Sequence, residues 1–75
     1  MTDLRISPIQ RKLGQRIRER RLDLKMTQAQ LADKTGLDRT YISGLESGRR
    51  NPALRNLNKL ANSLKISIDQ LMKFD

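Results

Sequence analysis

Signals that begin α-helices recur along the whole chain, and they constrain its fold more than any other feature. Two cap-then-proline pairs and two capping-box spacings mark the starts: Ser7-Pro8, Asn51-Pro52, Thr27 with Gln30, and Ser67 with Gln70. Proline fits the first helical position because the N–H that it lacks would have no helical partner there. A capping box satisfies two further N–H groups of the first turn. Apolar residues between these signals recur every three or four positions, which predicts helices and no strand.

The sequence therefore predicts one compact all-α domain over residues 1–75. We expect five helices, at about residues 8–24, 28–35, 39–47, 52–64 and 67–73. Seventy-five residues are too few for a second domain, since domains usually need ~100 residues or more. A core of this size is only marginally stable. With no cysteine and no histidine, we expect no metal and no cofactor, and association with a second copy remains as the available reinforcement.

The first expected helix carries a charge on its apolar face. Ile9, Leu13 and Ile17 follow at intervals of four, and the next position on that line is Arg21. A buried charge needs a partner, because unpaired burial is expensive. Glu46 lies roughly 70° from the centre of the core face of the third helix, at its edge, counting 100° per residue. We expect Arg21 and Glu46 to form a structural ion pair; a solvated surface pair is the alternative.

Residues 28–47 have the spacing of a helix-turn-helix: two short helices separated by a three-residue turn that contains Gly36. In the second of these helices, Ile42 and Leu45 define the core face. The opposite face is small and polar, as a helix that enters a DNA major groove needs to be, and consists of Thr40, Ser43, Gly44 and Ser47. Arg39 lies on one flank, where its long side chain can reach outward.

Gly44 is unusual, because a glycine inside a helix costs ~1 kcal/mol relative to alanine. Two explanations remain open. Glycine would let the backbone of a partner approach closely, or it would relieve a clash with the preceding helix.

Net charge favours a polyanionic partner. Sixteen Lys and Arg against eight Asp and Glu leave a charge of +8, which suits nucleic acid. Residues 47–51 place Arg49 and Arg50 in a loop before a helix N-terminus, and backbone N–H groups, a helix dipole and arginines together favour phosphate. A solvated basic turn is the alternative. The only aromatic residues are Tyr41 and Phe74, which argues against a single-strand binder that stacks bases on several rings.

Many positions together resemble the Xre/Cro-type, lambda-repressor-like helix-turn-helix family over about residues 9–72. The matching positions are Thr27-Gln28, Leu31-Ala32, Gly36-Leu37, Arg39-Thr40-Tyr41-Ile42-Ser43, Leu45-Glu46, Gly48 and Asn51-Pro52. Within the family, residues 37–44 are similar to the controller proteins of restriction–modification systems. One position departs: many members have a glycine where this chain has Lys25. The first helix must therefore end differently, or hold a lysine in the left-handed conformation.

The resemblance implies which residues touch DNA. It implies a phosphate contact from Gln28 and base contacts from Arg39 and Thr40. It also implies contacts with the DNA backbone from Tyr41, Ser43, Ser47, Arg50 and Asn51, with Tyr41 or Arg50 also able to reach a base edge. Its structural ion pair falls on Arg21 and Glu46. Combined with the outward face, we expect base contacts from Arg39, Thr40, Tyr41 and Ser43. We expect phosphate contacts from Gln28, Ser47, Arg49, Arg50 and Asn51. Arg39 would most simply donate two hydrogen bonds to a guanine.

The C-terminal segment holds more apolar residues than one short helix can bury on one side, namely Ile66, Ile68, Leu71, Met72 and Phe74. Surplus apolar surface marks an interface, so we expect a homodimer that binds the two halves of a pseudo-palindromic operator in double-stranded DNA. Completion of the monomer core is the alternative. The controller resemblance implies regulation of the protein's own promoter, with RNA polymerase as a further candidate partner.

Other function classes fit less well. Without histidine, cysteine or a phosphate-binding loop, we expect no enzyme, and no small-molecule ligand is evident. An antitoxin or a phage-type repressor with a protein partner is the main rival, although almost no tail follows Met72. A nucleoid binder without sequence preference is a further rival. No apolar run approaches the ~18 residues of a membrane span, and no apolar core of a signal peptide is present, so we expect a cytoplasmic protein.

Overall fold

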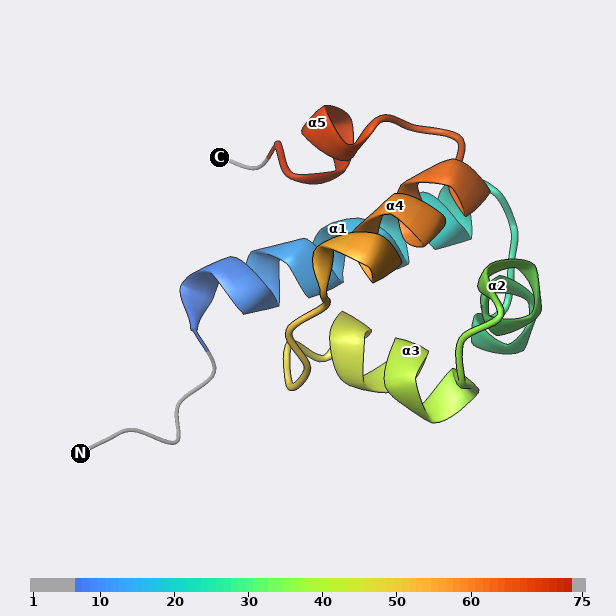
Figure 1. Cartoon of the computed structure of the whole chain (residues 1–75), viewed down its shortest axis with the longest axis horizontal. Helices are drawn as coiled ribbons and strands as arrows, with labels where there is room; N and C mark the ends of the chain where they lie inside the picture. Colours follow the sequence, from blue (N-terminus) through green and yellow to red (C-terminus); the bar gives the residue numbers. More distant parts are fainter. Residues whose placement is uncertain (1–6, 74–75) are drawn as a thin grey trace.

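The computed structural model describes residues 7–73, and within that range the chain is all helix and turn. Five helices follow one another: α1 (Pro8–Asp23), α2 (Gln28–Thr35), α3 (Arg39–Glu46), α4 (Leu54–Ser63) and α5 (Ile68–Leu71) (Figure 1). The predicted all-α, five-helix fold is confirmed. None of these helices is both long and apolar enough to cross a membrane.

Three of the helix starts follow the local signals. The Ser7 hydroxyl accepts a hydrogen bond from the backbone N–H of Gln10, with Pro8 opening α1. Both capping boxes form, at Thr27 before α2 and at Ser67 before α5. In each box the side chain and the backbone of two residues satisfy each other's N–H groups, which explains why short helices begin reliably at these residues.

Helix α4 begins two residues later than Asn51-Pro52 predicts. Its first residue is Leu54, and the N-cap is Ala53, which makes no side-chain capping bond. The N–H groups of Arg49 and Arg50 both donate to the Gly44 carbonyl oxygen, at 2.9 and 3.2 Å. The chain thus stays hydrogen-bonded to α3 as far as residue 50. Residues 51–53 then connect this loop to the first residue of α4.

Lys25 is in the left-handed conformation, with φ of 58°. Helix α1 therefore closes as the family pattern requires, but with a lysine in place of the usual glycine. The reversal is held by Lys25 N–H donating to the Leu22 carbonyl oxygen at 2.9 Å and Met26 N–H donating to that of Arg21 at 3.1 Å. Lys65, just after α4, repeats the conformation with φ of 58°. Both positions carry strain that glycine would avoid.

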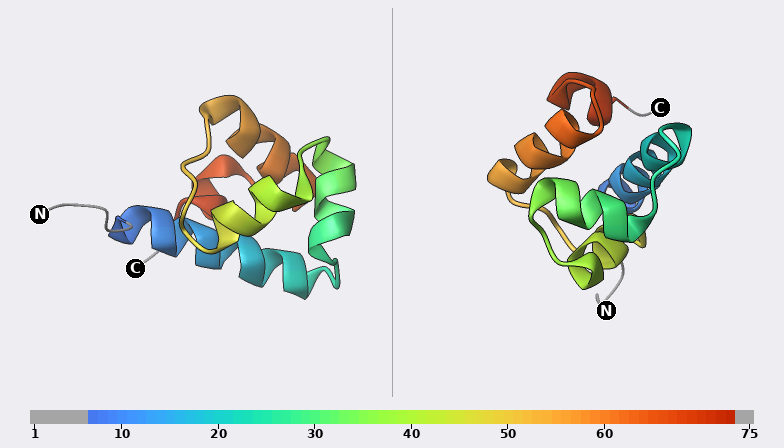
Figure 2. Two further views of the ribbon diagram at one scale, coloured as in Figure 1. Left: turned by 90° about the horizontal axis from the view of Figure 1, so that it is seen from below. Right: turned by 90° about the vertical axis from the view of Figure 1, so that its right-hand side faces the viewer.

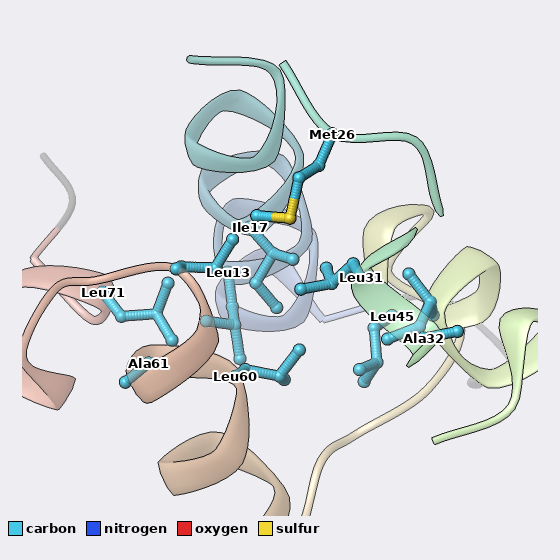
Figure 3. Packing of buried hydrophobic residues seen from close by; sticks show 11 residues of the cluster. Leu13, Ile17, Met26, Leu31, Ala32, Leu45, Leu60, Ala61 and Leu71 are labelled. Atoms are coloured by element: carbon cyan, nitrogen blue, oxygen red, sulfur yellow. The ribbon is translucent and has the colours of Figure 1, made fainter. Parts of the chain in front are cut away.

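The core is a single cluster to which all five helices contribute (Figure 3). Its fully buried members are Ile17, Leu31, Ile42, Leu45, Leu60, Leu64 and Leu71. Two members of the predicted apolar stripes lie outside it: Ile9 is 62% exposed and Leu54 is 73% exposed. Each stands in the first turn of its helix. The first turn of α1 projects beyond the other helices, where no neighbour is available to cover it (Figure 2).

Helices α3 and α5 lie on opposite sides of the molecule, separated by α1 and α4 (Figures 1 and 2). Helix α1 packs against both of them. The polar face of α3 and the apolar residues around α5 are therefore on separate surfaces. Each surface could contact a different molecule at the same time.

Candidate nucleic-acid interface

Helix α3 is held by its apolar side and leaves its polar side open. Ile42 and Leu45 are fully buried against α1 and α2. Arg39, Thr40 and Ser43, on the other side of the helix, are exposed. Because the buried residues are fixed in a packed core, the exposed ones project from a rigid support, as a surface that discriminates between base edges requires.

Four of the predicted contact residues line one shallow hollow of about 290 Å³: Gln28, Arg39, Thr40 and Ser43. Gln28 is the first residue of α2, whose first N–H groups lack partners within the helix. The hollow thus combines groups of α2 that are predicted to bind phosphate with side chains of α3 that are predicted to read bases.

A second hollow of about 380 Å³ lies on the other side of Thr40. Its lining consists of Gly36, Leu37, Asp38, Thr40, Tyr41, Arg50 and Asn56. Thr40 belongs to both hollows and so stands on the ridge between them. A DNA strand lying along this ridge could contact residues of α2, α3 and α4 with its phosphates or its base edges.

Tyr41 is half-buried and held at both its ring and its hydroxyl group. The hydroxyl oxygen accepts a hydrogen bond from Asn56 Nδ2 at 3.0 Å. Its own proton therefore remains free to donate to a phosphate or a base acceptor. The Arg50 guanidinium carbon lies 5.8 Å from the ring centroid, within range of a cation–π interaction. Sequence reasoning missed Asn56, because nothing local connects a polar residue of α4 with α3.

The loop after α3 is anchored on two sides. Its backbone donates to Gly44 as described, and Gln10 Nε2 donates to the Gly48 carbonyl oxygen at 3.2 Å. The loop residues predicted to bind phosphate are exposed: Ser47, Arg49, Arg50 and Asn51. Ser47 differs from the others, because its hydroxyl donates to the Gly44 carbonyl oxygen at 3.1 Å. A phosphate contact from Ser47 requires this hydroxyl to turn outward.

Arg21 and Glu46 form a buried ion pair that joins α1 to α3. Arg21 Nε donates to Glu46 Oε2 at 2.7 Å and Nη2 donates to Oε1 at 3.0 Å, with side chains 8% and 4% exposed. A third donor, Nη1, meets the Met26 carbonyl oxygen at 2.7 Å. The hydrogen bond to Glu46 raises the pKa of Arg21, so the guanidinium stays charged.

Gln28 is also part of this network. Its Nε2 donates to Glu46 Oε1 at 3.1 Å, which orients the side chain at the edge of the first hollow. The amide keeps one N–H and its carbonyl oxygen for other partners. The ion pair therefore fixes α3 in the core and also orients the first residue of α2.

The structure revises the explanations for Gly44. A Cβ atom placed there would meet the side chain of Arg50, which supplies the three nearest atoms. Relief of a clash with α2 is therefore not the reason for the glycine. Close approach of DNA remains an expectation.

The predicted dimer residues divide into three groups. Ile66, Ile68 and Met72 are half-buried and pack against the core. Leu71 is fully buried in the core, so it is not available to a second copy. Phe74 lies outside the described residues. The segment is joined to α1 by Arg16, whose Nε donates to the Gln70 carbonyl oxygen at 3.3 Å.

In residues 7–73 no cluster of three or more Asp and Glu side chains has a geometry that could hold a metal ion. The cationic side chains that line the two hollows beside α3 are Arg39 and Arg50.

A family model described as helix-turn-helix matches residues 17–71, which include α2, the turn and α3. The chain belongs to the helix-turn-helix family. The family predicted from the sequence is thereby confirmed, and the second helix of the motif is α3.

Relatives within this family are regulators. The chain is 40% identical over 60 residues to the immunity repressor protein of Bacillus phage phi105, covering 80% of this chain and 42% of the repressor. It is 40% identical over 62 residues to the control protein C.BamHI of Bacillus amyloliquefaciens, covering 81% and 76%. The chain spans about half the length of that phage repressor and of a second phage repressor.

Solved structures agree with the sequence matches. The restriction–modification controller protein C.AhdI from Aeromonas hydrophila superposes with a TM-score of 0.80 and 46% sequence identity, covering 81% of this chain and 92% of that one. The similarity to controller proteins noted in the sequence is thus found in both a curated relative and a solved structure.

Proposed function

We propose that this chain is a sequence-specific regulator of transcription that binds double-stranded DNA through α3, as a restriction–modification controller. One observation carries the proposal: Arg39, Thr40 and Ser43 are exposed on a helix whose opposite side, at Ile42 and Leu45, is fully buried. Its relatives among controllers and repressors support the same function.

Binding would combine two kinds of contact. Arginines and lysines neutralise phosphates and release counterions, which supplies affinity that falls with salt but contains no sequence information. Arg49 is exposed in the loop after α3 and is suited to this role, while the amides of Gln28 and Asn51 can hydrogen-bond to phosphate oxygens without neutralising them. They would set the position and angle of α3 in the major groove.

Base contacts would supply the specificity. Arg39 is exposed at the first position of α3 and can donate two hydrogen bonds to O6 and N7 of a guanine, worth ~1–3 kcal/mol against a wrong base. Thr40, on the ridge, offers a methyl group to thymine or a hydroxyl to a neighbouring base. Tyr41 and Ser43 lie on either side with hydroxyl groups that can donate.

A second copy of the chain would double the number of bases read. Ile66, Ile68 and Met72 are half-buried and belong to or flank α5, which lies on the side of the molecule away from α3 (Figures 1 and 2). A homodimer through these residues would leave both reading helices free. Dimers of this kind bind half-sites about one turn, ~34 Å, apart. Sedimentation equilibrium that shows only monomer at micromolar concentration would remove the dimer from the proposal.

The test is a titration against DNA from immediately upstream of the protein's own gene, with an equal-length scrambled duplex, at two salt concentrations. We expect a preference of ~10³-fold or more for the upstream DNA, lost in Arg39→Ala. Equal and steeply salt-dependent binding of both duplexes would instead indicate a nucleoid-type binder. Addition of RNA polymerase to the bound upstream DNA tests whether the polymerase is a further partner of the protein, which we expect to act in the cytoplasm.

The matches to phage repressors support a second candidate, a phage-type repressor with a protein partner. Specific binding to a phage operator, without binding upstream of the chain's own gene, would favour it.

A further inference from the structure

The side chain of Arg50 occupies the space beside Gly44 that a side chain at position 44 would fill. A Cβ atom built on Gly44 would lie 2.6 Å from Arg50 Cγ, 3.5 Å from its Nε and 3.6 Å from its Cβ. The first distance is far below van der Waals contact. The arginine therefore crosses α3 at the one position of that helix that has no side chain.

Both ends of this arrangement are held in place. At the backbone, the N–H groups of Arg49 and Arg50 donate to the Gly44 carbonyl oxygen, so the loop cannot easily move away from α3. At the other end, the guanidinium of Arg50 lies over the ring of Tyr41, and Asn56 holds the Tyr41 hydroxyl. A Cβ at position 44 would then be accommodated most easily by rotation of the Arg50 side chain away from the ring.

The glycine is not required by the backbone. The glycines with positive φ in residues 7–73 are Gly36 and Gly48, and Gly44 is not among them. Alanine would fit the helix and favour it by ~1 kcal/mol. Glycine is unfavourable inside this eight-residue helix. The structure supplies a reason for it, because the Arg50 side chain occupies the space that a larger residue would need.

We infer that Gly44 is a positioning residue for DNA recognition: by lacking a side chain, it lets Arg50 lie across α3 against Tyr41, ready to contact DNA. The inference rests on the proposed function, in which Arg50 touches phosphate or a base edge. A long arginine side chain that is ordered before binding loses less conformational entropy when it binds. Gly44 would increase affinity in this way without touching DNA.

Gly44→Ala, Arg50→Ala and the double variant test this inference by affinity for DNA upstream of the protein's own gene. Gly44→Ala should melt at or above the wild-type temperature and bind about two- to tenfold more weakly, the range that corresponds to ordering one side chain. In the Arg50→Ala background, Gly44→Ala should have no further effect. Arg49→Ala is the matched control: with the neighbouring arginine removed, the effect of Gly44→Ala should persist in full.

An equal loss in the Arg50→Ala background would overturn the inference, because Gly44 would then act through its own approach to DNA. Unchanged affinity of Gly44→Ala would overturn it as well. If the alanine variant melts below the wild type, its melting temperature should recover in the Arg50→Ala background, because the atoms that a Cβ at position 44 would meet belong to the Arg50 side chain.

Nuclear Overhauser contacts between Arg50 and the ring of Tyr41, the only tyrosine of the chain, test the positioning without DNA. They should be present in the wild type and lost in Gly44→Ala, and their persistence in the variant would refute the inference. A wild type without any sequence preference would refute the proposed function alone, while these contacts would still decide the role of Gly44.

Discussion

The buried ion pair between Arg21 and Glu46 makes the strongest prediction about stability. Arg21→Met keeps a long side chain but removes the charge and its three hydrogen bonds. The carboxylate of Glu46, 4% exposed, would keep only the hydrogen bond from Gln28. Removal of one partner of a buried pair costs about 3–5 kcal/mol, because it leaves an uncompensated buried charge.

This cost is large for a chain of 75 residues. Stabilities of ~0.05–0.15 kcal/mol per residue imply about 4–11 kcal/mol for the whole domain. At roughly 4–8 °C per kcal/mol for a domain of this size, the melting temperature should fall by about 12 °C or more. Arg18→Met, at an exposed position of the same helix, is the control and should change the stability by less than about 0.5 kcal/mol.

Thermal and urea unfolding followed by far-ultraviolet circular dichroism measures both variants. The double variant Arg21→Met with Glu46→Leu should recover much of the lost stability, since replacement of a whole buried pair by apolar residues is often neutral. If Arg21→Met lowers the free energy of unfolding by less than about 1 kcal/mol, the pair behaves as a solvated surface pair. It would then not be the buried link between α1 and α3.

Three further variants test other parts of the account. Gly14→Ala should lower the stability by about 1–3 kcal/mol in a urea titration, because its Cβ would lie 2.7 Å from the Glu46 carbonyl oxygen; unchanged stability would mean that α1 and α3 can separate freely. Lys25→Gly should raise the stability by about 1 kcal/mol, since it removes a left-handed lysine, whereas Lys25→Ala should not, and equal effects would contradict this explanation. Asn56→Ala should weaken binding to the upstream DNA about two- to tenfold by releasing Tyr41; the same loss in a Tyr41→Phe background would show that Asn56 acts by another route.

Local and periodic features of the sequence were sufficient for most of the fold. The capping boxes at Thr27 and Ser67 act over three residues, so they can be read without knowledge of the tertiary structure. The charge at Arg21 stood on an apolar stripe, which implied a partner on a facing helix. The signal at Asn51-Pro52 misplaced the start of α4, because the preceding loop remains hydrogen-bonded to Gly44.

Contacts made by tertiary packing could not be predicted in the same way. The hydrogen bond from Asn56 to Tyr41 joins residues on helices whose relative position depends on the whole core. The contact between Arg50 and Gly44 depends on how the loop folds back onto α3. Both contacts lie beside the predicted base-reading residues, so the sequence predicted which side chains would face DNA but not the groups that orient them.

Selection of duplexes from a random library by the wild-type protein, at about 0.15 M salt, tests whether α3 reads DNA sequence. We expect an enriched pseudo-palindromic motif with half-sites separated by ~10 base pairs from centre to centre, and loss of preference at one base pair of each half-site in Arg39→Ala. Recovery of no motif, with duplexes retained only by charge, would contradict the claim that α3 reads DNA sequence.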